Sequence, residues 1–224
     1  MQGGRGSSWA GKRAVALAGA TGLVGRLILE ALLADMSVQA IHVLGRGSPR
    51  VAHARLTWHI VDFAALPALP PVDEVYLALG TTIKVAGSQS AFRAVDFDAS
   101  LAVARAALAA GARRCGLVSA MGANEKSSIF YNRVKGELEV ALAELCFKGL
   151  VIARPSLLLG DRSVLGQPGR PLERIGETLS KILGALIPAN YRPIAAAQVA
   201  RVLVARTPSA NGRTVVLSGE MRRT

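Results

Sequence analysis

Short apolar runs alternate with stretches of helical periodicity along most of the chain. The apolar runs are predicted to be strands: Ala14–Ala18, Ala40–Leu44, Leu56–Val61, Val72–Leu79, Cys115–Ser119, Leu150–Ala153 and Arg213–Ser218. The stretches with apolar residues three or four apart are predicted to be helices: Arg26–Leu33, Ser90–Ala110, the stretch that carries Tyr131–Glu139, Leu172–Leu183 and Ala196–Ala205. This alternation predicts an α/β fold with a doubly wound, mostly parallel sheet and right-handed crossovers.

A glycine-rich turn joins the first predicted strand to the first predicted helix. Its glycines allow a sharp turn at Gly19, close backbone approach to a pyrophosphate at Gly22, and tight helix packing at Gly25. Backbone N–H groups at the helix start would face the phosphates. We therefore expect a cofactor-binding turn formed by Gly19, Thr21, Gly22, Leu23, Val24 and Gly25. The alternative is a turn that only packs a strand on a helix.

The ends of the second and third predicted strands offer contacts to an adenosine. Arg46 follows the second strand, where an arginine favours a 2′-phosphate and an acidic residue favours a free ribose hydroxyl, so NADP(H) is expected rather than NAD. The alternative is an ordinary surface arginine. Asp62 and Phe63 follow the third strand and could meet an adenine, or be a helix cap and a core residue.

Further along, Leu79, Gly80 and Thr81 end the fourth predicted strand. The glycine would let a cofactor pass close by, and the threonine hydroxyl could bond to ribose or phosphate. We expect all three residues to bind the cofactor.

A second group of candidate residues follows the fifth predicted strand. Tyr131 and Lys135 are four residues apart and share one helix face. A lysine ammonium stabilises a nearby phenolate, which lets a tyrosine give a proton to an alkoxide or take one from an alcohol. Ser119, at the strand end, would polarise a carbonyl. Taken alone, the Tyr–Lys pair could equally be a solvated helix face; its place after the glycine turn favours catalysis.

These motifs together resemble the atypical short-chain dehydrogenases/reductases, and within them the Tat-interacting-protein-like group of NAD(P)H-binding proteins. The matching segments are Gly19–Gly25, Val61–Phe63, Leu79–Thr82, Val118–Ala123, Tyr131–Glu137 and Arg154–Asp161. The resemblance implies a Rossmann fold that binds NADP(H), the serine, tyrosine and lysine roles of Ser119, Tyr131 and Lys135, and a nicotinamide next to Pro155. Lys135 would also contact the nicotinamide ribose. Many members have a catalytic asparagine where this chain has Asp96.

Composition excludes some functions. The chain has 224 residues and a net charge of +12, which invites a nucleic-acid interpretation. However, its basic residues form no dense run, and aromatic residues make up 4% of the chain, too few for a base-stacking platform. We therefore expect no nucleic-acid partner, and a positive field that attracts an anionic cofactor.

Other sequence features bear on location and on metals. No apolar stretch is long enough for a membrane span, and Met1–Gly11 lacks the apolar segment of a secretory signal. We expect no membrane partner and a cytoplasmic protein whose cysteines, Cys115 and Cys146, are reduced and buried. Without a Cys-x-x-Cys pair or a histidine cluster, no metal site is expected; His42 and His59 are expected to have no chemical role.

The expected organisation is a disordered leader over residues 1–12 and one domain over residues 13–224, with residues 160–195 as a small substrate-side cap. The expected function is NADP(H)-dependent hydride transfer between nicotinamide and a small carbonyl or alcohol. The alternative is a non-catalytic NADP(H)-binding regulator that acts through protein partners. Helix-mediated dimers occur in the family, which makes a homodimer one expectation.

Overall fold

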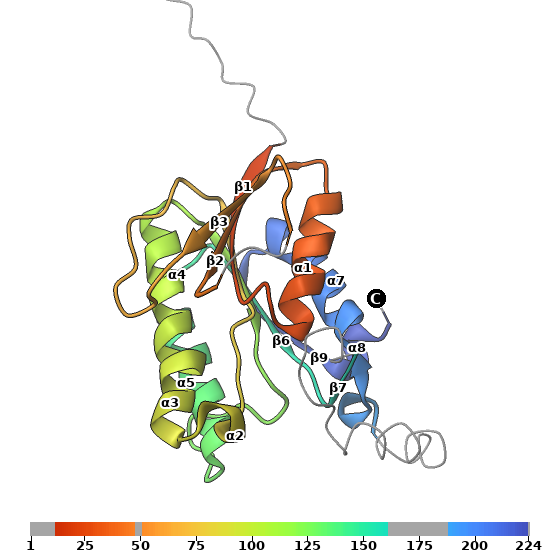
Figure 1. Ribbon diagram of the computed structural model, residues 1–224. Helices are drawn as coiled ribbons and strands as arrows, with labels where there is room; N and C mark the ends of the chain where they lie inside the picture. Colours follow the sequence, from red (N-terminus) through yellow and green to blue (C-terminus); the bar gives the residue numbers. More distant parts are fainter. Residues whose placement is uncertain (1–11, 48–50, 161–187, 224) are drawn as a thin grey trace, which may run out of the picture.

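The computed structural model describes residues 12–47, 51–160 and 188–223. Its main feature is a seven-stranded parallel sheet in the order β3-β2-β1-β4-β5-β6-β9 (Figure 1). The strands are β1 (Arg13–Ala18), β2 (Val38–Gly45), β3 (Leu56–Ile60), β4 (Glu74–Leu77), β5 (Arg114–Val118), β6 (Gly149–Arg154) and β9 (Gly212–Leu217). The predicted doubly wound parallel sheet is confirmed, although its fourth strand is shorter than expected.

Helices cover both faces of this sheet (Figure 1). On one face lie α1 (Leu23–Ala34) and α7 (Ala196–Arg206), and on the other lie α4 (Ser100–Ala109) and α5 (Phe130–Glu144). Strand β1 shows how the sequence produces two cores. Val15 and Leu17 pack under α1 and α7, whereas Ala14, Ala16 and Ala18 pack under α4 and α5. A strand buried on both faces reads as one continuous apolar run.

The long helix predicted from Ser90 to Ala110 is divided. It consists of α3 (Gln89–Arg93), a π-helical segment η1 (Ala94–Ala99) and α4. Apolar periodicity does not reveal the division, because one wider turn changes the spacing only slightly. Such turns are frequent at functional sites, and here the wider turn contains the buried Asp96.

Two helices near the predicted site start differently. Helix α2 (Ile83–Ala86), which follows β4, begins where the Thr82 hydroxyl accepts the backbone N–H of Val85. Helix α5 begins at Phe130, after Ile129, and has no side-chain cap.

One cysteine differs from expectation, and two histidines are in contact. Cys115 is buried, but Cys146 is exposed, and both are free. Nδ1 of His42 lies 3.1 Å from Nε2 of His59 across β2 and β3, so these two side chains are partners. Burial lowers the pKa of His42, and the neighbouring His59 adds to this effect.

The part of the chain that follows β6 is described only in pieces. The two-residue strands β7 (Leu158–Leu159) and β8 (Ile194–Ala195) pair in parallel, and η3 (Ala189–Tyr191) precedes β8 and contacts α8 (Ser218–Met221). The predicted leader, the helix over 172–183 and most of the predicted cap lie outside the described residues.

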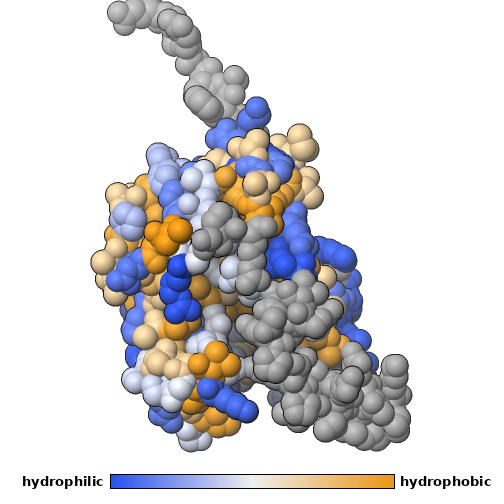
Figure 2. Space-filling model, viewed as in Figure 1, coloured by the Kyte–Doolittle hydropathy of each residue, from blue (hydrophilic) through white to orange (hydrophobic). Residues whose placement is uncertain are grey.

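The surface of the described residues is mixed. On the face shown in Figure 2, hydrophobic residues lie in several separate places rather than in one continuous band. None of the helices in the described ranges is both long and apolar enough to cross a membrane.

Candidate functional site

Most predicted site residues follow the carboxyl ends of the parallel strands, which share one edge of the sheet. Strand β1 is central, with β2 on one side and β4 on the other. The strand order therefore reverses between β1 and β4. Doubly wound folds bind their ligands beside the carboxyl ends of the strands at this reversal.

The three glycines of the turn after β1 have different surroundings. Gly19 has φ +93°, and a Cβ on it would lie 2.3 Å from the carbonyl oxygen of Ala78. A Cβ on Gly25 would lie 2.0 Å from the carbonyl oxygen of Gly19. A Cβ on Gly22 would meet no heavy atom closer than 3.3 Å. Packing within the protein thus requires glycine at positions 19 and 25, whereas a Cβ at position 22 would make a tight contact that a small shift could relieve.

The other predicted members of this turn offer backbone rather than side chains. Leu23 and Val24 are buried in the core, and only Thr21 is exposed. Helix α1 starts after Gly22 without a side-chain cap. Its first N–H groups have no partner within the helix and can therefore donate to an anion.

The predicted adenosine contacts lie after neighbouring strands. Arg46 is exposed directly after β2, which lies next to β1. Asp62 follows β3, is exposed, and accepts the backbone N–H of Ala64 at 2.9 Å in a turn rather than at a helix start. Phe63 is partly buried against the core under α4 and α5. The geometry leaves Arg46 the freest of these three to meet a ligand.

The residues after β4 connect the glycine turn to the Tyr–Lys helix. Leu79, Gly80 and Thr81 follow β4 directly, beside the turn after β1. The backbone N–H of Thr81 donates to Oδ2 of Asp96 at 2.9 Å. The other carboxylate oxygen, Oδ1, lies 2.7 Å from Nζ of Lys135. One carboxylate thus contacts both a predicted cofactor-binding residue and a predicted catalytic residue.

The Lys135 ammonium and its carboxylate partner are both buried. Lys135 is 4% exposed and Asp96 is 1% exposed. Burial alone would lower the pKa of Lys135, but Asp96 foremost, with Tyr131 and Glu139, outweighs burial and raises it. Lys135 is therefore an ammonium throughout the neutral pH range.

Tyr131 lies at the accessible end of this group. It is partly exposed, and its ring packs against the buried ring of Phe92 at a centroid distance of 5.5 Å. Tyr131 and Lys135 both lie on α5, four residues apart, so they share one face of that helix.

Ser119 is placed after β5 as expected, but its hydroxyl already has a partner. It donates to Oε1 of Glu139 at 2.5 Å. Glu139 is 1% exposed and also accepts from Arg154 at 2.6 Å and from Arg213 at 3.3 Å. The hydrogen bonds to Glu139 raise the pKa of Arg154. To polarise a carbonyl, the Ser119 proton has to leave Glu139.

Pro155 is buried directly after β6, and its carbonyl accepts the backbone N–H of Met121 at 2.8 Å. This bond fixes the loop after Ser119 to the end of β6.

The sequence analysis did not identify Asp96 and Glu139 as partners of the predicted catalytic residues. The available signals were an acidic residue within an apolar helical stretch, and a glutamate four residues after Lys135 on the same face.

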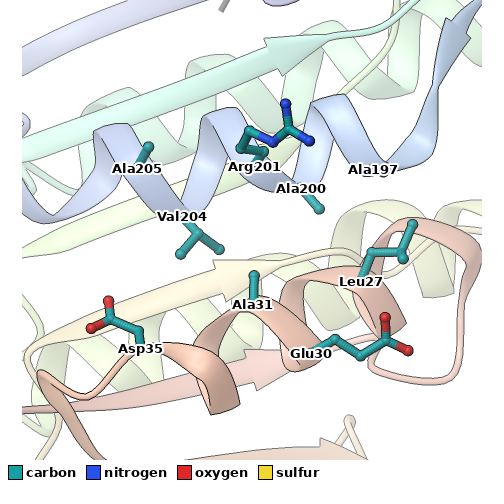
Figure 3. A pocket seen from close by; sticks show the side chains of 9 residues that line it. All are labelled: Leu27, Glu30, Ala31, Asp35, Ala197, Ala200, Arg201, Val204 and Ala205. Carbon is teal, nitrogen blue, oxygen red and sulfur yellow. The ribbon is translucent and has the colours of Figure 1, made fainter.

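A shallow groove on the outer side of α1 and α7 is separate from these residues. It has a volume of about 490 Å³, and Figure 3 shows Ala31 and Val204 pointing toward one another between the two helices. It contains no predicted site residue. Within the described ranges, no three histidine, cysteine, aspartate or glutamate residues are grouped so that they could hold a metal ion.

Comparison with solved structures supports the fold. A UDP-N-acetylglucosamine 4-epimerase from Methanobrevibacter ruminantium M1, in complex with UDP-N-acetylmuramic acid, has a TM-score of 0.68 at 16% identity, covering 92% of this chain and 77% of the epimerase. The Bordetella bronchiseptica enzyme WbmH, in complex with NAD+, has a TM-score of 0.67 at 16% identity, covering 94% of this chain and 78% of WbmH. At this identity the likeness establishes the Rossmann-like architecture.

No protein-family model matches the chain, but individual relatives do. It is 36% identical over 180 residues to the protein fmp52, mitochondrial, of Emericella nidulans, covering 76% of each chain. It is 32% identical over 194 residues to the protein FMP52, mitochondrial, of Candida albicans, covering 83% of this chain and 84% of the relative. These names overturn the expected cytoplasmic location, which rested only on missing sequence signals. Given this identity over most of both chains, the protein belongs to the Fmp52 family.

Proposed function

We propose that the protein is an NADP(H)-dependent oxidoreductase that acts on a small carbonyl or alcohol. The observation that carries this proposal is the convergence of the glycine turn and the buried Asp96–Lys135 pair at the strand-order reversal. The fold is shared with WbmH, which was solved with NAD+. The resemblance to the Tat-interacting-protein-like group supports the same assignment.

Two features of the turn after β1 support this assignment. Of its three glycines, only Gly22 is not in severe conflict with an added Cβ, and the N–H groups that follow it have no partner within helix α1. A pyrophosphate needs both a close backbone and such donors. We assign the turn Gly19–Gly25 to the pyrophosphate, and the loop Leu79–Thr81 to the ribose and phosphate beside it.

The chemistry then falls to the residues of α5 and the end of β5. The nicotinamide, when bound, supplies or accepts the hydride. Tyr131 gives a proton to the substrate oxygen or takes one from it, and Lys135 stabilises the phenolate by its charge. Ser119 holds the substrate oxygen after its proton turns away from Glu139. Pro155 borders the nicotinamide side of the site.

The choice of NADP(H) rests on Arg46, and a titration tests it. Arg46→Ala should weaken NADPH binding by about 10- to 100-fold, the loss of one charge-assisted phosphate contact, and leave NADH binding unchanged. Binding is measured by fluorescence titration of the purified protein with each cofactor. Arg201→Ala, an exposed arginine on α7, is the matched control.

The outcomes separate the parts of the proposal. Equal losses for both cofactors would remove the 2′-phosphate role from Arg46 but keep a dinucleotide site. Failure of the wild-type protein to bind either cofactor would overturn the function as a whole.

A second function has one observation in its favour. The Ser119 proton is engaged by Glu139 and the Lys135 charge by Asp96, so two of the three predicted catalytic residues have charged partners inside the protein. A protein that binds NADP(H) and signals through a partner without turnover fits this arrangement. NADPH binding without NADPH oxidation, across a panel of aldehydes, ketones and quinones, would favour this second function.

We also infer a mitochondrial location, because the relatives that span most of the chain carry that word in their names. Fractionation of cells of the source organism, probed with an antibody against the chain, tests it. Recovery in the cytosolic fraction alone would contradict the inference.

A further inference from the structure

We propose that Asp96 is a positioning residue that ties the Lys135 ammonium to the backbone of the loop after β4. The proposal builds on the proposed function, since it assigns Lys135 to the reacting end of the site. It goes further by making a residue of η1 the link between the cofactor-side loop and the catalytic helix.

The geometry of Asp96 supports a link between two elements. Its Oδ2 accepts the backbone N–H of Thr81 at 2.9 Å, and its Oδ1 lies 2.7 Å from Nζ of Lys135. Thr81 follows β4 and Lys135 is on α5, so the carboxylate joins parts of the chain that are far apart in sequence. The π-helical turn of η1 contains Asp96.

Because Asp96 and Lys135 are both buried, the loss of either partner should be costly. Because both partners are almost completely buried, removing the carboxylate would leave an ammonium without its counter-charge in a site that water does not reach. The ionisable groups that act on Lys135 are Asp96 from η1, and Tyr131 and Glu139 from its own helix. Asp96 is the strongest influence that favours the charged form. Oδ1 lies 2.7 Å from Nζ of Lys135, within the range of an ion pair.

The sign of the pH effect follows from these contacts. The pKa of Lys135 is raised above the ordinary 10.5, so the ion pair stabilises the fold at neutral pH and up to that point. This stabilisation is lost only as the pH rises through the higher folded-state pKa. Without Asp96, burial would still disfavour the ammonium, and the strongest interaction that favours it would be missing. Lys135 should then release its proton at a lower pH.

The decisive experiment follows the Lys135 side chain by NMR in cofactor-free protein labelled with ¹³C at the lysine ε carbons. The Lys135 signal is assigned with Lys135→Arg. In Asp96→Asn its titration midpoint should fall by about 1 to 3 pH units. Asp98→Asn changes an exposed carboxylate of the same segment and should leave the midpoint unchanged. An unchanged midpoint in a folded Asp96→Asn protein would overturn the proposal.

The wild-type protein alone also decides the question if Asp96→Asn does not fold. A Lys135 midpoint below 10.5 in the wild type would mean that no carboxylate holds the ammonium, and the proposal would fail. A midpoint above that value supports it.

The link to Thr81 is measured separately by amide hydrogen exchange. An asparagine keeps an acceptor oxygen, whereas Asp96→Ala removes it, so exchange at Thr81 should become about 10-fold faster in Asp96→Ala only. Equal exchange at Thr81 in both variants would show that Asp96 does not hold the loop.

The NMR and exchange measurements need neither cofactor nor turnover. They can therefore contradict the role of Asp96 without contradicting the proposed function, and a failed test of the function does not contradict the role of Asp96. Where turnover is observed, the alkaline limb of its pH profile should move to lower pH in Asp96→Asn by the same 1 to 3 units. Suppose that the Lys135 midpoint moves in this variant but the alkaline limb of the pH profile does not. Lys135 would then have no part in the reaction, and the positioning of Lys135 by Asp96 would still stand.

Discussion

Turnover is expected to fall by about 10²- to 10⁴-fold when Tyr131 is replaced by phenylalanine. The substitution removes one hydroxyl from a partly exposed ring and keeps the contact with Phe92, so the fold should be unaffected. Without the hydroxyl, the substrate oxygen has to exchange its proton with water. Steady-state rates with NADPH and a panel of aldehydes, ketones and quinones measure the loss.

Affinity for NADPH serves as the internal control for this variant, because the glycine turn and Arg46 are untouched. A rate close to that of the wild type would contradict the assigned role of Tyr131. If the wild type binds NADPH tightly but shows no turnover with any substrate of the panel, the non-catalytic regulator becomes the better description.

Gly25→Ala is expected to lower the free energy of unfolding by about 3 kcal/mol. The new Cβ would lie 2.0 Å from the carbonyl oxygen of Gly19. The nearest atoms all belong to the backbone of Gly19 and Ala20, so no flexible side chain can move aside. Helix α1 would have to shift away from the turn after β1, in the middle of the sheet. Urea unfolding followed by circular dichroism measures the loss.

Gly22→Ala is the matched control, since it adds the same methyl group three residues earlier in the same turn. Its nearest contact would be a tight 3.3 Å, which a small shift can relieve, and its φ of −83° suits alanine, so stability should fall by no more than about 1 kcal/mol. NADPH affinity should nevertheless fall in this variant. Equal destabilisation by both substitutions would argue against a space kept open for a ligand.

The sheet was predictable because its strands are buried on both faces. Runs such as Ala14–Ala18 are apolar at every position, and glycines or polar residues punctuate their ends. Parallel strands also place their carboxyl ends at one edge, so residues such as Arg46 and Ser119 could be assigned to that edge from sequence order alone. Tyr131 and Lys135 do lie on one helix, as their spacing predicted.

The carboxylate partners were not predictable in the same way. Asp96 meets Lys135 only because α5 packs against η1, and Glu139 meets Arg154 and Arg213 only because β6 and β9 are neighbours. Such contacts depend on how distant elements pack, and local periodicity does not contain that information. The wider turn of η1 is a similar case, because it changes the direction of one side chain without changing the apolar pattern.

The position of β9 has a consequence for the exposed margin of the sheet. All six residues of β6 are paired with β9, so among the described residues the edge of the sheet on this side is Gly212–Leu217. An uncovered strand is a template for pairing with other chains, and charged side chains discourage such pairing. Arg213 supplies that charge on β9 while its guanidinium contacts Glu139. The last strand of the chain thus shields the strand that carries Arg154 from association with other molecules.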